Sequence, residues 1–293
     1  ISIRILNKTG QFIELQKLGL EKANYQLFRF LIEKPHGIIL VSGPTGSGKS
    51  TSLYAALKEI NNVDKKVITI EDPIEYRLPG VVQIQINAKI GLTFASSLRA
   101  ILRNDPDVIM VGEIRDLETA EISIRTALTG HLVFSTIHTN NAAGSVTRLI
   151  DMGIEPFLVS SSVEGMIAQR LVRRICPVCK MEYEPDPLIL KRLGIKEDER
   201  EGVVLFKGRG CEACKYTGYK GRIAIFEIIR LNEKLRHLIV QQTPASVIQL
   251  EAIRMGMRTL RLDGWDKAKA GQTTVEEVFR VTQDEFSEIE GIN

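Results

Sequence analysis

The feature that most constrains this chain is a glycine-rich loop at residues 43–51, which fits the pattern G-x-x-x-x-G-K-[ST]. Its backbone N–H groups must turn inward on a phosphate, and glycines permit conformations that a side chain would block. The lysine of this pattern reaches the β- and γ-phosphates, and the next hydroxyl binds Mg²⁺. We therefore expect a nucleoside triphosphate at nine residues, with Ser50 as a magnesium ligand: Gly43, Pro44, Thr45, Gly46, Ser47, Gly48, Lys49, Ser50 and Thr51.

The segments on either side of the loop support this interpretation. Residues 37–41 form a short apolar run typical of a buried parallel strand, and residues 51–60 are predicted to be helical. A helix that begins directly after the loop adds its N-terminal dipole to anion binding. Because motif and context agree, a chance glycine-rich turn is a poor alternative.

Strands and helices are predicted to alternate from residue 21 onward. Short, apolar, β-branched segments predict buried strands at 37–42, 66–70, 107–111 and 132–136. Helices are predicted at 21–36, 49–60, 92–102 and 117–129. Residues 81–86 alternate in polarity, which indicates an edge strand or a hairpin arm. The predicted fold class is therefore α/β.

The composition changes after about residue 175 and predicts further parts of the chain. Residues 176–222 hold four cysteines, several prolines and a charged loop, as in a small loop-rich module. A strand at 223–229 and helices over 231–293, separated by turns near 243–244 and 271, are predicted to follow. Residues 1–20 are interpreted as the end of a preceding, PAS-like N-terminal domain and its linker, so we expect a fragment of a longer protein. The predicted domains are 1–20, 21–175, 176–222 and 223–293.

Bulk properties exclude several classes of protein. The 293 residues are 44% hydrophobic and 26% charged, as in an ordinary globular protein. The net charge of +3 is too small to favour nucleic acid or a membrane surface as a partner. No apolar run approaches the roughly 18 residues of a membrane-spanning helix, and no export signal is recognisable. We therefore expect a cytoplasmic protein with reduced thiols.

The four cysteines form two pairs, Cys176-x-x-Cys179 and Cys211-x-x-Cys214. Four thiolates suit tetrahedral zinc, and a closed site of this kind is structural because it leaves no open position for chemistry. The segment between the pairs is longer than usual and is interpreted as an insertion. We expect the metal alone to stabilise this module, since it lacks apolar residues for a core. A redox-active C-x-x-C pair is the alternative, although no thioredoxin-like context is present.

Charged groups follow the predicted strands, where catalytic side chains lie in this fold class. Glu75 follows the strand at 66–70, Glu113 follows 107–111, and His138 follows 132–136. Carboxylates there can bind Mg²⁺ through water and orient an attacking water molecule, and a histidine can sense the γ-phosphate. Glu71 and Asp72 either join this chemistry or shape the turn before a proline.

Four motifs in order carry a family resemblance. They are the phosphate loop, residues 70–76 (the Asp box), residues 98–116 (ending in Walker B) and residues 129–140 (the His box). Over practically all its length the chain resembles the type II secretion and type IV pilus assembly ATPases, the GspE/PilB group of the secretion-ATPase superfamily. The resemblance implies a RecA-like P-loop NTPase core and Mg²⁺-dependent hydrolysis of ATP by a cytoplasmic homo-hexamer.

The resemblance also implies roles for acidic and histidine side chains. Glu75 polarises the attacking water, and Glu113 acts in Mg²⁺ coordination. His138 and, less surely, His131 couple the γ-phosphate to domain movement. His131 lies next to a predicted strand, so a structural, hydrogen-bonded role is equally open.

Arginines are implied to neutralise phosphate charge. Arg99 and Arg103 match such residues, at least one of them acting across a subunit boundary. Arg4 matches an arginine of the preceding domain, whose motion closes the site. With their spacing of four on a predicted helix, Arg99 and Arg103 could instead be solvated or paired with carboxylates.

The resemblance implies a motor for assembly of a pseudopilus or type IV pilus, at the cytoplasmic face of the inner membrane. Retraction ATPases generally lack the cysteine module, so an extension motor that acts through inner-membrane platform proteins is favoured, without direct nucleic-acid contact. One alternative is a DNA-uptake or nucleic-acid-translocating ATPase, and another is a nucleotide switch or zinc-binding adaptor with little turnover. Basic residues could dock an acidic partner or be solvated: Arg170, Arg173, Arg174, Lys180, Lys207, Arg209 and Lys215.

Overall fold

The computed structural model describes residues 14–192 and 202–282. These residues divide into two compact units, the first of residues 14–168 and 228–257, and the second of residues 169–192, 202–227 and 258–282. Within the described part, no helix has the length and apolar character needed to span a bilayer. Most of the segment interpreted as the end of a preceding domain, including Arg4, and the charged loop at 196–201 lie outside the described residues.

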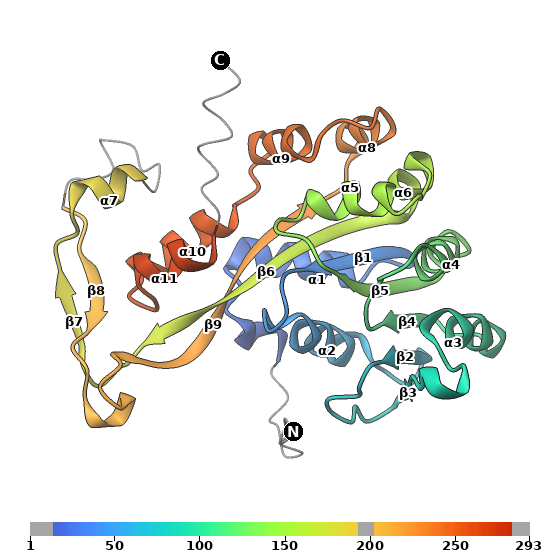
Figure 1. Cartoon of the computed structure of the whole chain (residues 1–293), viewed down its shortest axis with the longest axis horizontal. Helices are drawn as coiled ribbons and strands as arrows, with labels where there is room; N and C mark the ends of the chain where they lie inside the picture. The colour runs from blue at the N-terminus through green and yellow to red at the C-terminus, as the bar shows by residue number, and fades with distance from the viewer. Residues whose placement is uncertain (1–13, 193–201, 283–293) are drawn as a thin grey trace. The chain divides into compact units, whose positions relative to one another are not determined.

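The architecture is built on a sheet with the strand order β3-β2-β4-β5-β1-β6-β9 (Figure 1). Its strands are β1 (Gly37–Ser42), β2 (Val67–Glu71), β3 (Val81–Gln85), β4 (Val108–Val111), β5 (Leu132–Ile137), β6 (Val163–Ile175) and β9 (Tyr219–Arg230). β1 pairs in parallel with β5 and β6, β4 with β5, and β2 with β4 and β3. The predicted α/β class is confirmed. The edge position of β3 is confirmed too, whereas a hairpin arm is wrong because β3 runs parallel to β2.

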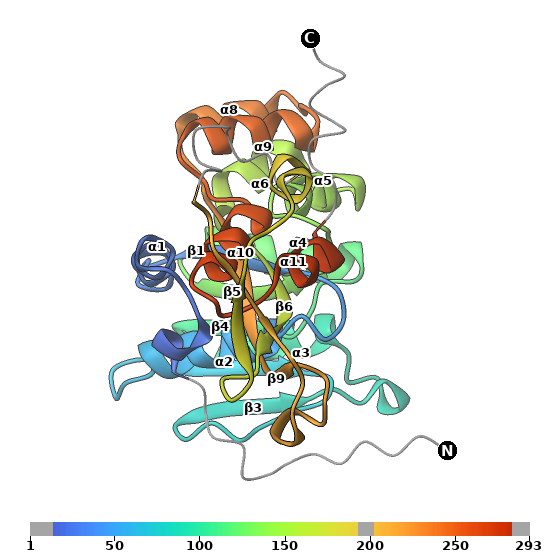
Figure 2. The same ribbon diagram turned by 90° about the vertical axis from the view of Figure 1, so that its left-hand side faces the viewer.

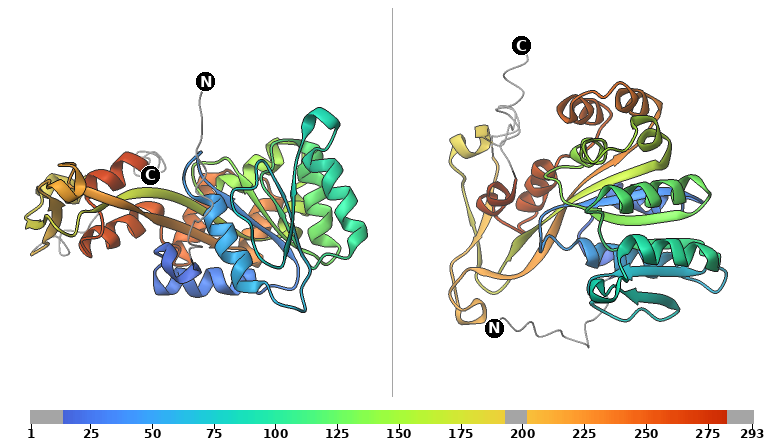
Figure 3. Two further views of the ribbon diagram at one scale, coloured as in Figure 1. Left: turned by 90° about the horizontal axis from the view of Figure 1, so that it is seen from below. Right: turned by 45° about the vertical axis from the view of Figure 1, so that its right-hand side comes forward.

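Helices cover both faces of this sheet in the first unit. α1 packs on α2, and Figure 3 shows them on the face opposite α3 and α4, which pack on each other. α8 and α9 lie side by side in both Figure 1 and Figure 2 and contact α6 and α5. The bounds are α1 (Lys22–Ile32), α2 (Lys49–Ile60), α3 (Phe94–Ile101), α4 (Leu117–Leu128), α5 (Gly144–Asp151), α6 (Pro156–Ser162), α8 (Glu233–Val240) and α9 (Ala245–Arg254).

The helices predicted at 21–36, 49–60, 92–102 and 117–129 are present, with differences of at most four residues at their ends, and residues 283–293 of the predicted C-terminal helical region lie outside the described residues. The helix expected over 21–36 stops at Ile32, and the one expected over 92–102 begins at Phe94, after a capping box formed by Thr93 and Ser96. The short 3₁₀ helices are η1 (Leu15–Leu18), η2 (Ala88–Ile90), η3 (Leu102–Asn104) and η5 (Glu212–Cys214). Neither α5, α6 nor the long strand β6 was predicted from the sequence.

The second unit contains a small antiparallel sheet of β7 (Lys180–Tyr183) and β8 (Leu205–Gly208), with α7 (Pro187–Arg192), α10 (Leu260–Lys269) and α11 (Val275–Val281). A buried apolar cluster forms there from Leu190, Leu205, Trp265, Ala268 and Val275. The expectation that the metal alone stabilises the cysteine module is therefore wrong. α10 and α11, distant in the sequence, supply the missing apolar side chains. Arg170 is also buried, so it does not belong to a basic docking surface.

The predicted division after residues 20, 175 and 222 concerns independent folding and stays a prediction. The compact units divide the chain elsewhere, because residues 258–282 group with residues 169–192 and 202–227. The long strands β6 and β9 each contain a boundary between the units.

A buried carboxylate fastens α11 to β6 within the second unit. Glu277 accepts hydrogen bonds from the Arg173 backbone N–H (2.9 Å), from the Arg173 guanidinium (2.7 Å) and from Arg280 (2.8 Å). Burial alone raises the pKa of a carboxyl, but these donors prevail and lower the pKa of Glu277 to about 2.

We predict that Glu277→Gln lowers the free energy of unfolding by about 1–2 kcal/mol at neutral pH, because charge-assisted hydrogen bonds are lost. A depressed folded pKa stabilises the protein above the unfolded pKa of 4.5, and this contribution disappears as the pH falls toward about 2. Urea unfolding should therefore show the two proteins converging between these pH values. Glu276→Gln, the same change on the exposed neighbour, is the control. A difference that does not change with pH would contradict the assignment.

Candidate functional site

The parallel strands bring the predicted site segments to one edge of the sheet. Ser42 at the end of β1 is in register with Ile137 of β5, Ser135 of β5 with Val111 of β4, and Val111 with Ile70 of β2. The residues that follow these strands therefore emerge together at the carboxyl edge. β5 separates β1 from β4, so the loop after β4 lies about 10 Å from the phosphate-loop strand.

The phosphate loop has the backbone that its glycines predict. Gly43, Gly46 and Gly48 have positive φ angles of 146°, 80° and 91°, which disfavour other residues. Lys49 begins α2, and its Nζ donates to the carbonyls of Gly43 (2.7 Å) and Pro44 (3.1 Å). The buried Ser47 hydroxyl has no partner among the described residues. The curled loop, the cation and the unpaired donor fit a phosphate group.

Glu113 follows β4 and is held near the loop after β5. Its carboxylate is 13% exposed and lies 3.4 Å from the His138 imidazole and 2.5 Å from the Arg115 guanidinium. The hydrogen bond to Glu113 raises the pKa of Arg115, so this side chain stays cationic. The backbone leading to Glu113 is fixed from β5, since the Thr136 hydroxyl donates to the Gly112 carbonyl at 2.8 Å. The structure thus brings together two predicted site residues and one unpredicted arginine.

A second acidic group is buried beside the first turns of α2. Glu71 ends β2 and accepts hydrogen bonds from the Tyr54 hydroxyl, the Thr69 hydroxyl (2.5 Å) and the Gln83 amide (3.0 Å). Glu75 follows in a loop at the same edge and is half-buried. The donors to both oxygens of Glu71 come from α2, β2 and β3, and none of them belongs to the turn before the proline.

The structure places His131 at the amino end of β5, opposite to the phosphate loop. Its Nδ1 lies 3.1 Å from the Thr126 carbonyl and 3.2 Å from the Thr129 hydroxyl. A strand of six residues spans roughly 20 Å, so His131 does not reach the loop within this chain. The geometry is that of the structural alternative.

The two predicted arginines lie away from the loop on an exposed surface. Arg99 lies in the last turn of α3 and pairs with Glu118 of α4 at 2.6 Å, and both side chains are more than half exposed. Arg103 belongs to η3, so the two do not share one α-helix as expected. Arg103 has no ion pair with any residue in the described ranges. Neither side chain is committed to the site of its own chain.

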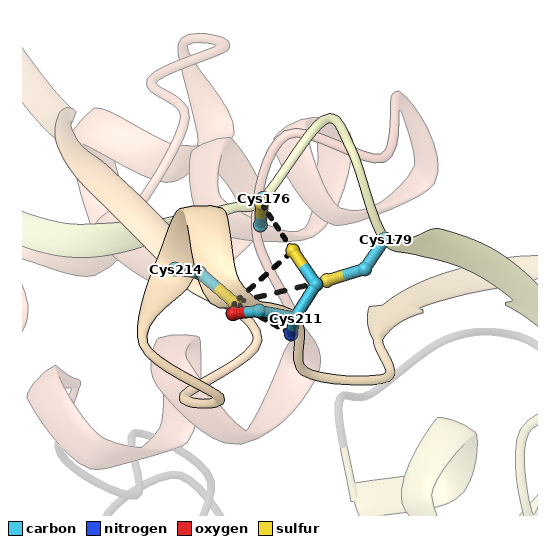
Figure 4. A group of neighbouring side chains, drawn as sticks. All are labelled: Cys176, Cys179, Cys211 and Cys214. Atoms are coloured by element: carbon cyan, nitrogen blue, oxygen red, sulfur yellow. Dashed lines mark hydrogen bonds between the residues drawn. The ribbon is translucent and has the colours of Figure 1, made fainter.

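The four cysteines converge from two loops, as Figure 4 shows. Their sulfurs all lie within 4.8 Å of one another, and three separations are 3.8–3.9 Å. Four sulfurs at about 2.3 Å from a tetrahedral zinc ion are about 3.8 Å apart, so this donor set fits zinc.

The backbone of the second cysteine loop also favours a thiolate. The N–H groups of Cys211 (3.2 Å) and Gly218 (3.3 Å) donate to the Cys214 sulfur. Burial opposes ionisation, but these donors lower the pKa of Cys214 to about 6. Gly208 and Gly218 meet backbone to backbone, where a Cβ on Gly208 would lie 2.1 Å from the Gly218 carbonyl oxygen. This close approach explains two of the glycines that flank the cysteines.

Comparison with known proteins adds independent evidence. A family model described as type II/IV secretion system protein matches residues 1–280. The type IV pilus assembly ATPase PilB of Thermus thermophilus is 52% identical over 280 residues, which cover 96% of this chain and 32% of the relative. The type II secretion system ATPase E of Vibrio cholerae is 50% identical over 284 residues, covering 97% and 56%. The chain thus spans about a third to just over half of these relatives.

Solved structures agree with the fold. The crystal structure of the pilus retraction motor PilT with bound ADP superimposes with a TM-score of 0.71 at 31% identity, covering 98% of this chain and 71% of that one. The ATPase DotB of Legionella pneumophila has a TM-score of 0.65 at 25% identity, covering 95% and 65%.

We predict that Cys211→Ser abolishes stoichiometric zinc binding and lowers the melting temperature, because three thiolates no longer close the tetrahedron. The cluster around Trp265 should keep the rest of the second unit folded, so proteolysis should increase mainly near residues 209–218. Elemental analysis and limited proteolysis measure these effects. Ala213→Ser, an exposed change between the same two cysteines, is the control. Retention of about one zinc ion per chain in Cys211→Ser would refute the four-thiolate site.

Proposed function

Because the chain belongs to the family of type II/IV secretion system proteins, we propose that it is the ATP-hydrolysing part of a motor for pseudopilus or type IV pilus assembly. The observation that carries the proposal is the convergence of the phosphate loop, Glu75, Glu113 and His138 at one edge of a parallel sheet. This edge offers a phosphate cradle, two carboxylates and an imidazole, which are the groups that phosphoryl transfer to water requires.

The residues at this edge have distinct proposed roles. Lys49 would pair with phosphate oxygens in place of the loop carbonyls. Ser50 and Glu113 would hold Mg²⁺. Bound Mg²⁺ neutralises the phosphate charge. Glu75 orients the attacking water, since its carboxylate has no partner among the described residues and is free to accept a hydrogen bond. His138 lies beside Glu113 and reports the state of this site to its own loop.

A ring assembly accounts for the exposed arginines. Arg99 and Arg103 lie on the surface of α3 and η3, where a neighbouring subunit could receive them. We propose that at least one enters the site of the next subunit in a homo-hexamer. Arg4, outside the described residues, is proposed to act from the preceding domain.

The partners are proposed to be inner-membrane platform proteins at the cytoplasmic face of the membrane. Assembly rather than retraction is supported by similarity, since identity is 50–52% to the ATPases of pilus assembly and type II secretion and 31% to the retraction motor. The zinc site is proposed to be structural and to stiffen the second unit. The exposed basic residues around it offer a docking surface for an acidic partner.

We predict that Glu75→Gln retains ATP binding and lowers turnover about a hundredfold or more, because an amide cannot accept a proton from water. Lys49→Ala should instead lose nucleotide affinity. Fluorescent-nucleotide binding and phosphate release separate the two effects. The control is Glu59→Gln, the same change on an exposed residue of α2. Loss of affinity in Glu75→Gln would reassign this residue to binding.

We also predict that the ATPase rate per chain rises with protein concentration, because neighbouring subunits complete each site. The rate should not respond to double-stranded DNA, measured in the same buffer. Stimulation by DNA at low concentration would favour a nucleic-acid motor. A near-zero rate at every concentration would favour a nucleotide-binding switch.

A further inference from the structure

The hydroxyl of Tyr54 lies between two elements of the site that the sequence does not connect. Tyr54 is on α2, one turn beyond the phosphate-loop residues that begin this helix, and its side chain is only 4% exposed. Its hydroxyl donates to Glu71 and accepts a hydrogen bond from the backbone N–H of Glu75 at 3.3 Å. One buried atom thus joins the phosphate-loop helix to the loop that carries the proposed catalytic carboxylate.

Glu71 is a fixed acceptor in this arrangement. One carboxylate oxygen takes the Tyr54 hydroxyl, and the other takes the Thr69 hydroxyl at 2.5 Å and the Gln83 amide at 3.0 Å. Burial, followed by the hydrogen bond to Glu71, raises the pKa of Tyr54, so the phenol remains a neutral donor. Because the proton of the phenol points to Glu71, a lone pair is left to accept the Glu75 N–H.

The loop around Glu75 has further tethers to the same cluster. The Gln83 amide also donates to the Tyr76 carbonyl at 2.9 Å, and its oxygen accepts the Leu78 N–H at 2.8 Å. The rings of Tyr54 and Tyr76 pack edge to face with centroids 5.9 Å apart. The segment 75–78 is thereby fixed at its backbone, whereas the Glu75 carboxylate itself has no partner among the described residues.

We propose that Tyr54 is a positioning residue. Its hydroxyl fixes the position of Glu75 relative to the phosphate loop, while Glu71 holds the phenol in place. The proposal rests on the proposed function, since it assumes that Glu75 orients the attacking water. Its consequence is that α2 and the Glu75 loop move as one body. A catalytic group displaced by about 1 Å can lose roughly a hundredfold in rate, so this coupling matters for turnover.

The test is Tyr54→Phe in the complete protein, with steady-state ATPase measurements and thermal unfolding. We expect kcat to fall about tenfold while KM for ATP changes less than twofold, because the phosphate contacts remain and only the carboxylate is misplaced. The melting temperature should change by only a few degrees, since the ring stays packed. Tyr25→Phe, which removes a hydroxyl near Gln16 on α1, is the matched control and should leave kcat unchanged.

A double-mutant cycle with Glu75→Gln separates positioning from a general structural effect. If Tyr54 acts through the Glu75 carboxylate, Tyr54→Phe should change the residual single-turnover rate of Glu75→Gln by less than twofold. A multiplicative loss, an unchanged kcat in the single variant, or a loss confined to KM would each overturn the proposal. An inactive wild-type protein would instead refute the proposed function.

A second variant covers the case in which Tyr54→Phe does not fold. Gln83→Leu removes the hydrogen bonds from β3 to Glu71, Tyr76 and Leu78 and keeps the Tyr54 hydroxyl. It should give the same separation of kcat from KM and the same lack of effect in the Glu75→Gln background. Wild-type kcat in folded Gln83→Leu would overturn the proposal.

Discussion

The parallel pairing of β1, β5, β4 and β2 is the constraint on which the rest of this site depends. In parallel strands the carboxyl ends lie at one edge, so loops from widely separated parts of the chain meet there. β5 separates the phosphate-loop strand from β4, and His138, which follows β5, lies beside Glu113, which follows β4. Gly112 permits close packing at this edge, because a Cβ there would lie 3.1 Å from the Ile70 carbonyl oxygen. The convergence of the site residues and the close packing at Gly112 therefore both depend on the same parallel strand order.

Much of this arrangement could be predicted from the sequence, because its signals are local. The glycine-rich loop, the apolar strands and the cysteine spacing each depend on a few neighbouring residues, and the structure confirms the α/β class. β6 was missed because Gln169 and Arg170 interrupt its apolar run, although both are buried. His131 and His138 were predicted from the same motif, yet they lie at opposite ends of β5. Tyr54 carries no local signal, since its role comes from contacts with β2 and the loop beyond it.

In the cysteine module, residues close together and residues far apart in the sequence contribute to the same structure. The two C-x-x-C pairs define the two loops that bring the four cysteines together, and the sequence predicts these loops from the spacing within each pair. The packing of the surrounding sheet depends on Trp265 and Val275, which lie far along the chain and were predicted only as part of a helical region. Composition within 176–222 therefore underestimates the apolar surface available to it. Glu277 adds hydrogen-bonded ion pairs between α11 and β6, so the cysteine cluster, the apolar core and the ion pairs lie in different parts of one unit.

Three glutamates near one edge of the sheet differ in the donors around them, and the roles proposed for them follow from this difference. Both oxygens of Glu71 accept hydrogen bonds from protein donors, so most of the acceptor capacity of this carboxylate is used within the protein. Glu113 is paired with Arg115 and lies beside His138, which fits its proposed role as a magnesium ligand. The carboxylate of Glu75 has no partner among the described residues, and its backbone N–H is hydrogen-bonded to the Tyr54 hydroxyl. The existing partners of an acidic residue in such a site therefore indicate the role to propose for it. A carboxylate with several protein donors positions neighbouring groups. A carboxylate in an ion pair can exchange its partner, and one without a partner is available for catalysis.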